Sequence, residues 1–312
     1  MSKLKILVTG GAGFIGSNIV AELIVRGYEV RVLDNFSSGK RENLKKYEKE
    51  IELIEGDIRS YHIVQQAVKG VEIVLHQAAL PSVPRSIKDP ITSNDVNVNG
   101  TLNILEASVA AKVRRVVYAS SSSVYGDNPD LPKKETMIPN PLSPYAVSKL
   151  AGEKYCSVFS RIYGLETIAL RYFNVFGPNQ DPSSQYSAVI PKFIEAINND
   201  RQPVIYGDGE QTRDFTFVDN IIEANILSAF TKCVSGIAMN CAGNGQISLN
   251  DLVKHINKNF SKEIEPIYED PRAGDIKHSF ADIQLAGNKI NYSPFVNFEE
   301  GLKLTIDSYV NK

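Results

Sequence analysis

The sequence predicts an α/β protein with a doubly wound parallel sheet and a smaller mixed α/β substrate-binding lobe, and two observations favour this class. In the first half of the chain, short β-branched runs alternate with longer amphipathic segments, which is typical of βαβ units on a parallel sheet. After about Asn174 the pattern changes, because "FGPNQDPSSQYS" is rich in turn-forming residues and mainly helical segments follow it. No Gly/Ser linker separates the two parts, so we expect them to share a cleft.

The expected elements follow one another in chain order. Strands are expected at Leu4–Thr9, Glu29–Leu33, Ile51–Glu55, Val71–His76, Arg115–Ser120 and Glu166–Arg171. Helices are expected at Phe14–Arg26, Tyr61–Lys69, Val98–Ala111 and Pro144–Tyr163, and two later short strands at Pro203–Tyr206 and Ile237–Asn240. Because crossovers between parallel strands are right-handed, residues 1–174 are expected to form a Rossmann-type domain. Residues 175–312 then form the second lobe, from which segments near 215–241 can pack back on the first domain.

Composition excludes several classes of partner. The chain has 312 residues and a formal net charge of -2, which gives no reason to expect a nucleic acid or an anionic membrane as partner. No apolar stretch approaches the roughly 20 residues that span a bilayer, and the first apolar run is too short for a secretion signal. Three scattered cysteines and four histidines show no metal spacing, so we expect no metal site and a cytoplasmic protein.

A glycine-rich turn follows the first expected strand. The stretch "VTGGAGFIGSNIV" places Gly10, Gly13 and Gly16 between that strand and the first helix. Glycines there permit a tight turn and a close approach of the backbone to a pyrophosphate at the helix N-terminus. The second strand ends in Asp34, whose carboxylate can accept the ribose hydroxyls of an adenosine and repels a 2′-phosphate. Asn35 and a serine-rich loop follow it rather than an arginine, so the pattern favours NAD over NADP.

A tyrosine and a lysine lie one helical turn apart in "PLSPYAVSKLAGEKY". Ser143 is the expected N-cap and Pro144 the first helical residue, which places Tyr145 in the first turn and Lys149 on the same face. Lowering the pKa of a tyrosine from ~10 to ~7 requires about 4 kcal/mol of preferential stabilisation of the phenolate. A lysine ammonium and an oxidised nicotinamide ring are the positive neighbours that can supply it. The row of hydroxyls in "ASSSSVYGD" ends an adjacent strand, so we expect it beside this tyrosine.

These motifs together resemble the extended short-chain dehydrogenase/reductase family over essentially the whole chain. The matching stretches are "TGGAGFIG", "DN" at Asp34-Asn35, "GDI" at Gly56–Ile58, "NVNGT" at Asn97–Thr101, "SSSSVYGD", "SPYAVSK" and "LRYFNVFGP". The resemblance implies a catalytic triad of Ser121, Tyr145 and Lys149. Ser121 would hydrogen-bond the reacting sugar oxygen, Tyr145 would exchange the proton of that oxygen, and Lys149 would hold the nicotinamide ribose and lower the pKa of the tyrosine.

The resemblance also implies a full set of NAD contacts in residues 1–174. Asp57 is expected near the adenine amino group, with Ile58 beside it. The expected cofactor-binding residues are Gly10, Gly13, Phe14, Ile15, Gly16, Asp34, Asn35, Ser37, Ser38, Gly39, Asp57, Ile58, Gln77, Ala78, Ala79, Ser120, Tyr145, Lys149 and Tyr172.

The pattern is most similar to UDP-hexose 4-epimerases. Nucleotide-sugar dehydratases of the family usually carry Thr-Asp-Glu where this chain has Ser121-Ser122-Ser123, so the missing carboxylates disfavour dehydration. The stretches "SVPRSIKDP", "AVIPKFI", "GDGEQTRDFTFVDN" and "RAGDIKHSFAD" resemble epimerases that accept N-acetylated sugars. The resemblance implies interconversion of UDP-GlcNAc with UDP-GalNAc, and of UDP-Glc with UDP-Gal, through a transient 4-keto sugar. NAD would be tightly bound and regenerated in each turnover.

The expected substrate contacts come mostly from residues 175–312, the UDP-sugar-binding lobe. They are Ser82, Ser122, Ser123, Asn174, Val189, Tyr206, Arg213, Arg272, Asp275 and Ser279. Arg213 and Arg272 would meet the diphosphate, since guanidinium forks suit phosphate oxygens. Ser279 occupies the position of a gate residue, where a tyrosine would exclude an N-acetyl group and a small side chain leaves room.

Two other functions stay open. The first is a UDP-glucuronate decarboxylase or 4-epimerase, which needs a cation near the sugar carboxylate; Arg85 or Lys88 could serve. The second is a non-catalytic NAD-binding regulator, although such proteins commonly lose the Tyr/Lys pair that this chain retains. Relatives use the helices that match Val98–Ala111 and Pro144–Tyr163 for a two-fold dimer, so a homodimer through a four-helix bundle is expected.

Overall fold

A parallel sheet of seven strands organises the protein, for which the computed structural model describes residues 4–180, 188–271 and 277–310. Its strands are β1 (Lys5–Thr9), β2 (Glu29–Asp34), β3 (Ile51–Glu55), β4 (Ile73–His76), β5 (Arg115–Ser121), β6 (Glu166–Tyr172) and β11 (Ile237–Cys241). They lie in the order β11-β6-β5-β4-β1-β2-β3 and are all parallel. From β1 the chain adds β2 and β3 on one side and then β4, β5, β6 and β11 on the other, so the strand order reverses between β1 and β4. All six strands expected in the first half are confirmed to within two residues, and so is the doubly wound fold class.

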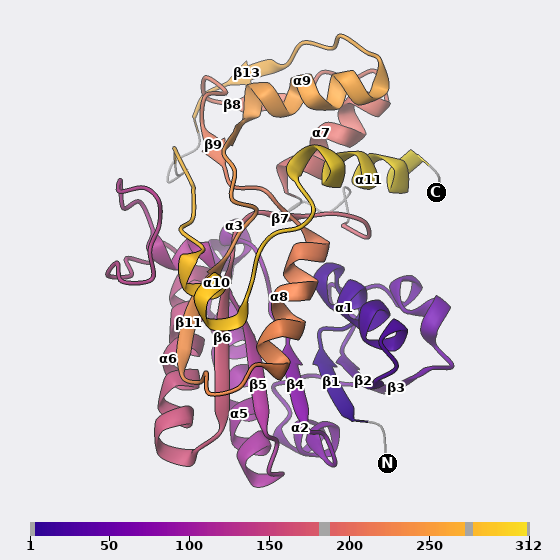
Figure 1. Cartoon of the computed structure of the whole chain (residues 1–312). Helices are drawn as coiled ribbons and strands as arrows, with labels where there is room; N and C mark the ends of the chain where they lie inside the picture. Colours follow the sequence, from indigo (N-terminus) through magenta and orange to yellow (C-terminus); the bar gives the residue numbers. More distant parts are fainter. Residues whose placement is uncertain (1–3, 181–187, 272–276, 311–312) are drawn as a thin grey trace.

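Helices cover both faces of this sheet (Figure 1). α1 (Phe14–Val25) and α8 (Val218–Phe230) pack together on one face. α2 (Tyr61–Val68), α5 (Gly100–Ala110) and α6 (Pro144–Tyr163) form the other layer. The helix expected at Val98–Ala111 begins instead with a π-helical turn, η3 (Asp95–Asn99), and becomes α-helical at Gly100.

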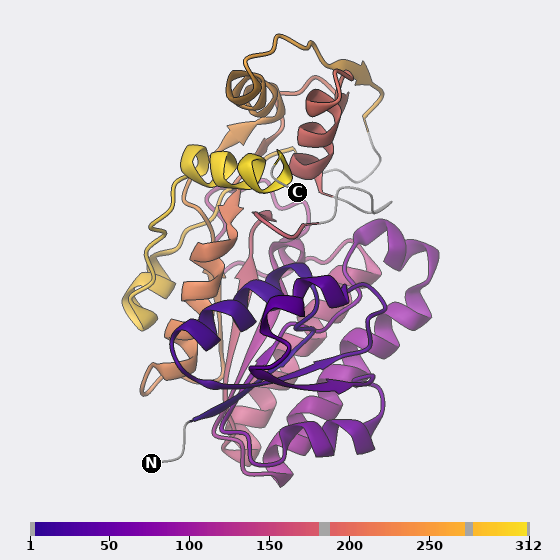
Figure 2. The same cartoon turned by 90° about the vertical axis from the view of Figure 1, so that its right-hand side faces the viewer.

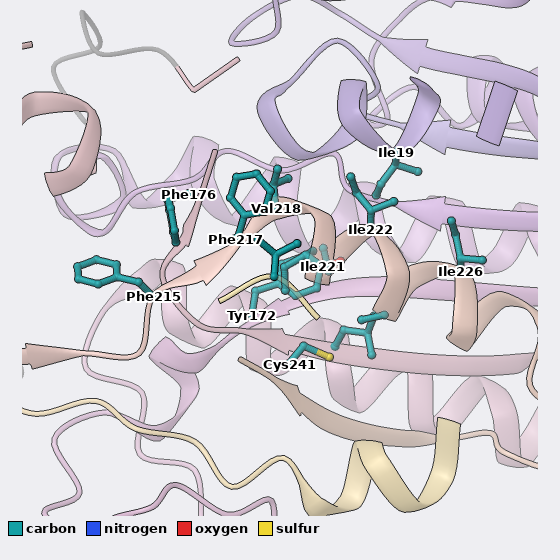
Figure 3. Close-up of a cluster of buried hydrophobic side chains, with 14 of the residues drawn as sticks. Ile19, Tyr172, Phe176, Phe215, Phe217, Val218, Ile221, Ile222, Ile226 and Cys241 are labelled. Atoms are coloured by element: carbon teal, nitrogen blue, oxygen red, sulfur yellow. The ribbon is translucent and has the colours of Figure 1, made fainter. Parts of the chain in front are cut away.

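The α1/α8 face is held by a continuous apolar cluster. Figure 3 shows Ile222 and Ile226 of α8 directed toward Ile19 of α1, while Ile221 lies on the side of Tyr172 at the end of β6. These side chains are almost completely removed from water. Burying each of them contributes about 1.5–3 kcal/mol before the cost of ordering the chain. α8 is therefore fixed against the sheet, although it lies far beyond residue 174 in the sequence.

The last strand of the sheet also comes from the second half of the chain. The sequence predicts Ile237–Asn240 only as a short strand after the change of pattern, whereas β11 pairs in parallel with β6, from Ile237 opposite Ile168 to Cys241 opposite Tyr172. The pairing joins residues about seventy positions apart, which local sequence pattern cannot reveal. α8 and β11, both from the second half of the chain, thus pack against or within the seven-stranded sheet.

The remaining elements form a smaller lobe over the carboxyl ends of the strands (Figures 1 and 2). Its helices are α7 (Val189–Asn198), α9 (Leu249–Phe260) and α11 (Phe298–Val310). Three two-stranded pairs accompany them: β8 (Val204–Tyr206) with β13 (Ile267–Glu269), β9 (Thr212–Arg213) with β12 (Ile247–Ser248), and β7 (Val175–Phe176) with β10 (Thr216–Phe217).

Several short helices and helical turns complete the described part of the chain. They are the helices α3 (Val83–Lys88), α4 (Pro90–Asn94) and α10 (Gln284–Ile290) and the 3-10 turns η1 (Arg41–Asn43), η2 (Lys45–Tyr47) and η4 (Ser122–Tyr125). Among the helices that the structure describes, none combines the length and the apolar character needed to cross a membrane.

Candidate active site

The turn between β1 and α1 leaves no room for a side chain at Gly10, and the first turn of α1 leaves none at Gly16. Gly10 has φ +67°, and a Cβ there would lie 2.7 Å from the backbone nitrogen of Ala78 after β4. A Cβ on Gly16 would lie 2.1 Å from the carbonyl oxygen of Gly10. α1 therefore begins directly against the turn, at Phe14 and Ile15, and its unpaired backbone N–H groups face the same edge.

Two carboxylates follow the neighbouring strands. Asp34 at the end of β2 is buried, and its two oxygens accept backbone N–H groups from Ala12 at 2.9 Å and Phe36 at 2.8 Å. Burial raises the pKa of Asp34, and these two N–H groups oppose the rise. Asp57 accepts hydrogen bonds from Arg59 and from the amide of Asn35, and Arg59 lowers the pKa of Asp57 to about 2. Hydrogen bonds thus hold the side chains of Asp34 and Asp57 in fixed orientations.

The residues on this edge fit NAD. The glycines let the turn after β1 pack directly against the backbone of Ala78, so that α1 begins at the edge of the sheet, and the N-terminus of α1 suits a pyrophosphate. Each oxygen of Asp34 keeps an acceptor site beyond its backbone bond, as the ribose hydroxyls require. Other members of the expected NAD-binding set that the structure places along these loops are Asn35, Ser37, Ser38, Gly39, Asp57, Ile58, Ala78 and Ala79.

Gln77 and Tyr172 meet at the ends of β4 and β6. The Tyr172 hydroxyl lies 3.2 Å from the Gln77 side-chain oxygen, and the Asn225 amide of α8 contacts both residues. Asn225 is completely buried. The sequence predicts Gln77 and Tyr172 as site residues but not the helix that fixes them, because Asn225 belongs to a segment far along the chain.

The three expected catalytic residues come together at the ends of β5 and α6. Ser121 is the last residue of β5, and its hydroxyl lies near enough to the Tyr145 phenol to favour the phenolate. Lys149 lies one turn along α6, is 4% exposed, and donates its Nζ hydrogen bond to the Ala119 carbonyl at 2.9 Å. That Nζ is 5.9 Å from the centre of the Tyr145 ring.

Burial sets the charges of this pair. It lowers the pKa of Lys149 to about 8. It raises the pKa of Tyr145, which the nearby Ser121 hydroxyl opposes. At neutral pH Tyr145 is therefore a neutral phenol. A further positive neighbour, such as the oxidised nicotinamide ring that the sequence predicts, would lower the pKa of Tyr145.

Further serines surround the triad. Ser123 contributes a buried Oγ that has no hydrogen-bond partner among the described residues, although its backbone N–H donates to Ser121 Oγ. Ser122 and Ser123 begin η4. Ser82 has φ +97°, a conformation that a non-glycine residue adopts at a cost of about 1–3 kcal/mol. It caps α3, where Ser86 Oγ accepts the backbone N–H of Tyr145 at 3.0 Å.

A cavity of about 280 Å³ opens between the sheet edge and the smaller lobe. The residues that line it include Asn174, Val189, Tyr206, Gln211, Arg213 and Phe215. Four of these were expected substrate contacts, and the structure brings them together from β8, β9, the start of α7 and the end of the sheet. Arg272 and Asp275, the other expected anchors, lie outside the described residues.

The segment with the expected gate residue lies beside this cavity. Ser279 is half-buried, and its backbone N–H donates to the carbonyl of Thr212, next to Arg213. Two residues later, Ala281 N–H donates to the buried carboxylate of Asp214 at 3.2 Å. Ser279, the expected gate residue, is therefore bonded to β9, the same short strand whose Arg213 lines the cavity.

Three buried residues near these groups were not among the site residues expected from the sequence. Glu153 lies one turn after Lys149 on α6 and pairs with Arg171 of β6; the four-residue spacing from Tyr145 and Lys149 was the available signal. Gln211 lies two residues before Arg213 and donates its amide to the Tyr206 carbonyl at 2.6 Å. His76 bridges Thr9 and Thr101, and burial lowers its pKa to about 3, so it stays neutral.

Comparison with known proteins agrees with this geometry. Residues 6–242 match the model of the NAD dependent epimerase/dehydratase family. The UDP-glucose 4-epimerase of Mycolicibacterium smegmatis is 37% identical over 99% of both chains. Among solved structures, UDP-N-acetylglucosamine 4-epimerase from Methanobrevibacter ruminantium M1 in complex with UDP-N-acetylmuramic acid is 43% identical, with a TM-score of 0.95 and coverage of 100% of this chain and 99% of that one. UDP-glucuronic acid 4-epimerase from Bacillus cereus, in complex with UDP-glucuronic acid and NAD, is 32% identical, with a TM-score of 0.92 and coverage of 99% of both chains.

Replacing the buried lysine should stabilise the protein while removing its function. The pKa of Lys149 is about 8 in the fold against an ordinary value of 10.5, so the unfolded chain binds more protons between these values and stability rises with pH there. At pH 7 we expect nucleotide-free Lys149→Met to be more stable than the wild type by about 1–3 kcal/mol. The gain should shrink between pH 8 and 10.5.

Urea unfolding at pH 7, 9 and 10 measures this difference. Exposed Lys154 on the same helix provides the control, since Lys154→Met removes a charge that is already in water. A Lys149→Met protein that is less stable at pH 7 would show that the bond to Ala119 outweighs the cost of burial.

Proposed function

This chain belongs to the NAD dependent epimerase/dehydratase family, and from that premise we propose that it is a UDP-sugar 4-epimerase, an isomerase. The proposed substrates are UDP-GlcNAc with UDP-GalNAc, and UDP-Glc with UDP-Gal. One observation carries the proposal: Ser121, Tyr145 and Lys149 come together where β5 ends against α6, and the adjoining Ser122 and Ser123 offer hydroxyls, not carboxylates. Similarity to the epimerases named above supports it.

Each catalytic side chain has a distinct role in this proposal. Tyr145 accepts the proton of the sugar C4 hydroxyl and later returns a proton to the C4 oxygen. Ser121 hydrogen-bonds that oxygen, and the positive charge of Lys149 favours the phenolate of Tyr145. Bound NAD supplies the acceptor, and then the donor, of the C4 hydride. The transient 4-keto sugar turns in the cleft between the two transfers, so the nucleotide must be anchored while the sugar is held loosely.

The cavity of the smaller lobe is the proposed anchor for UDP. Tyr206 is suited to stack on uracil, Val189 to contact it through the backbone, and Asn174 and Arg213 to meet the diphosphate. Arg272 for the diphosphate and Asp275 for the ribose complete the proposed set. A nucleotide held here would direct its sugar toward Ser122, Ser123 and the triad.

A second candidate is a UDP-glucuronate 4-epimerase or decarboxylase. Arg85 favours it, because this cation lies on α3 three residues after strained Ser82 and next to Ser86, whose hydroxyl accepts the backbone N–H of Tyr145. A guanidinium there could pair with a sugar carboxylate. Similarity to the Bacillus cereus enzyme is the other support.

Product analysis tests the proposed reaction. Purified protein given UDP-GlcNAc without added NAD should form UDP-GalNAc, which proton NMR distinguishes by the H4 coupling. Tyr145→Phe should lower the rate by about 10²–10⁴-fold, because it removes the acid/base group. Tyr155→Phe on the same helix should not, since its ring packs in the core.

The same assay separates the alternatives. Turnover of UDP-glucuronate, with none of UDP-GlcNAc or UDP-Glc, would replace the proposal by the second candidate. Bound NAD with no turnover of any UDP-sugar would indicate a non-catalytic protein.

Ser279 should control which sugar pair is accepted. Ser279→Tyr fills the space proposed for the acetamido group, so we expect UDP-GlcNAc turnover to fall at least about tenfold while UDP-Glc turnover is largely retained. The measurement is kcat/KM for both substrates. Ser279→Ala keeps the space and serves as the control; full UDP-GlcNAc turnover in Ser279→Tyr would refute the gate.

We also propose that the protein is a homodimer through α5 and α6. Val147, Val158 and Ile162 lie along one stripe of α6 and are 51%, 45% and 67% exposed. Covering such a stripe by a two-fold partner would form a four-helix bundle. In light scattering, the wild type should have twice the mass of Val158→Lys/Ile162→Lys. Exposed Val25→Lys on α1 should leave the mass unchanged, and a monomeric wild type would refute the dimer.

A further inference from the structure

A buried chain of polar side chains lies directly beneath the catalytic triad. Glu153 of α6 accepts the Ser120 hydroxyl at 2.5 Å and pairs with Arg171 of β6 through two bonds of 2.9 and 2.8 Å. Arg171 also donates to the Tyr125 hydroxyl at 2.8 Å, which in turn donates to the Asn240 side-chain oxygen at 2.6 Å. All five side chains are at most 6% exposed.

This polar network joins β5 and α6, the two elements that carry Ser121, Tyr145 and Lys149. Ser120 precedes Ser121 on β5, and Glu153 lies one turn beyond Lys149 on the same face of α6. A shift of α6 along β5 would break the bond to Ser120 and the paired bonds to Arg171 together. The separation between the serine at the end of the strand and the tyrosine and lysine of the helix therefore depends on this carboxylate together with the bond from Lys149 to the Ala119 carbonyl.

The network also reaches the gate. Asn240 of β11 donates its amide to the carbonyls of Lys133 and Asp282, at 2.9 and 3.0 Å. Asp282 follows Ser279 by three residues, and the segment between them is bonded to Lys133 through Phe280. The catalytic helix and the proposed sugar gate thus share one buried support.

A contribution to stability does not explain why the pair is ionic. A buried ion pair often contributes no more to stability than apolar residues of similar size, because desolvation offsets the attraction. What the pair adds is a fixed relative orientation of the two side chains, because a guanidinium fork and a carboxylate hold one another through two hydrogen bonds. The pair is neutral overall, so it orients the triad without adding net charge beside Tyr145.

We infer that Glu153 is a positioning residue: together with Arg171 it holds the catalytic helix α6 in register with the serine-rich end of β5. This inference rests on the proposed function, because it assigns Glu153 a role in that same reaction. Glu153 itself touches neither substrate nor reacting atoms in this role.

Glu153→Gln tests the inference. The amide keeps the size of the side chain but cannot form the charged fork with Arg171. We expect kcat for UDP-GlcNAc to fall roughly 10- to 100-fold, as small displacements of catalytic groups do, while KM stays within about twofold. Tyr125→Phe removes only the hydroxyl that joins Arg171 to Asn240, and kcat should fall by about three- to tenfold. This milder variant decides the question if Glu153→Gln does not fold.

Arg115, at the start of β5, provides a matched control, because Ser120 and Ser121 lie at the opposite end of this strand. Arg115 is 1% exposed, pairs with Glu166 and donates to the carbonyls of Ser228 and Thr231, remote from the triad. Arg115→Met should lower the Tm but leave kcat unchanged at a temperature where it is folded. Equal losses of kcat in Arg115→Met and Glu153→Gln would overturn the inference, because stability alone would then explain both.

An apolar replacement of both residues separates the effect of the pair on the orientation of α6 from its effect on stability. Glu153→Leu/Arg171→Met should regain the Tm lost in Glu153→Gln without regaining kcat. Recovery of kcat in that double variant, or a wild-type kcat in both Glu153→Gln and Tyr125→Phe, would overturn the inference. These outcomes are read against a wild type that turns over UDP-GlcNAc, whereas an inactive wild type would refute the proposed function instead.

Discussion

The site depends on a crossing of backbones that leaves no room for a side chain. A Cβ on Gly10 would meet the backbone of Ala78, and a Cβ on Gly16 would meet Gly10 itself. Because this contact fixes the turn after β1 against the end of β4, α1 begins at the point where the strand order reverses. In a doubly wound sheet that is where ligands bind. Asp34, Gln77, Ser121 and Tyr172 then come from the carboxyl ends of the strands or from the loops that follow them.

The same edge gathers charges that are costly to bury. Lys149 is almost fully removed from water, and the pKa of about 8 that burial gives it measures part of that cost. The structure limits the cost by direct partners: the Ala119 carbonyl for Lys149, backbone N–H groups for Asp34, and the Arg171 fork for Glu153. Each charged group is therefore held in one orientation, as preorganised catalysis requires.

Local pattern was sufficient for much of this arrangement. Short β-branched runs gave the first six strands, and Ser143 with Pro144 gave the start of α6, because these signals lie within the elements themselves. The glycines, Asp34 and the Tyr145/Lys149 pair follow from spacing alone. The position of β11, the contact of Asn225 with Tyr172, and the Glu153–Arg171 pair depend on tertiary contacts between distant segments. No sequence window contains both partners, so the sequence could not predict them.

The smaller lobe is attached to the sheet in a way that links substrate choice to the core. Asp214 is fully buried, and its carboxylate accepts backbone N–H groups from Gly243, after β11, and from Ala281, near the gate. Burial raises the pKa of Asp214 to about 7, although these N–H groups favour its charged form. Since Asn240 holds the same segment from the other side, the segment that carries Ser279, the proposed gate residue, has little freedom to move independently of β11. The side chain at position 279 can therefore change without disturbing this segment, because hydrogen bonds to the backbone of the segment, and not that side chain, set its position.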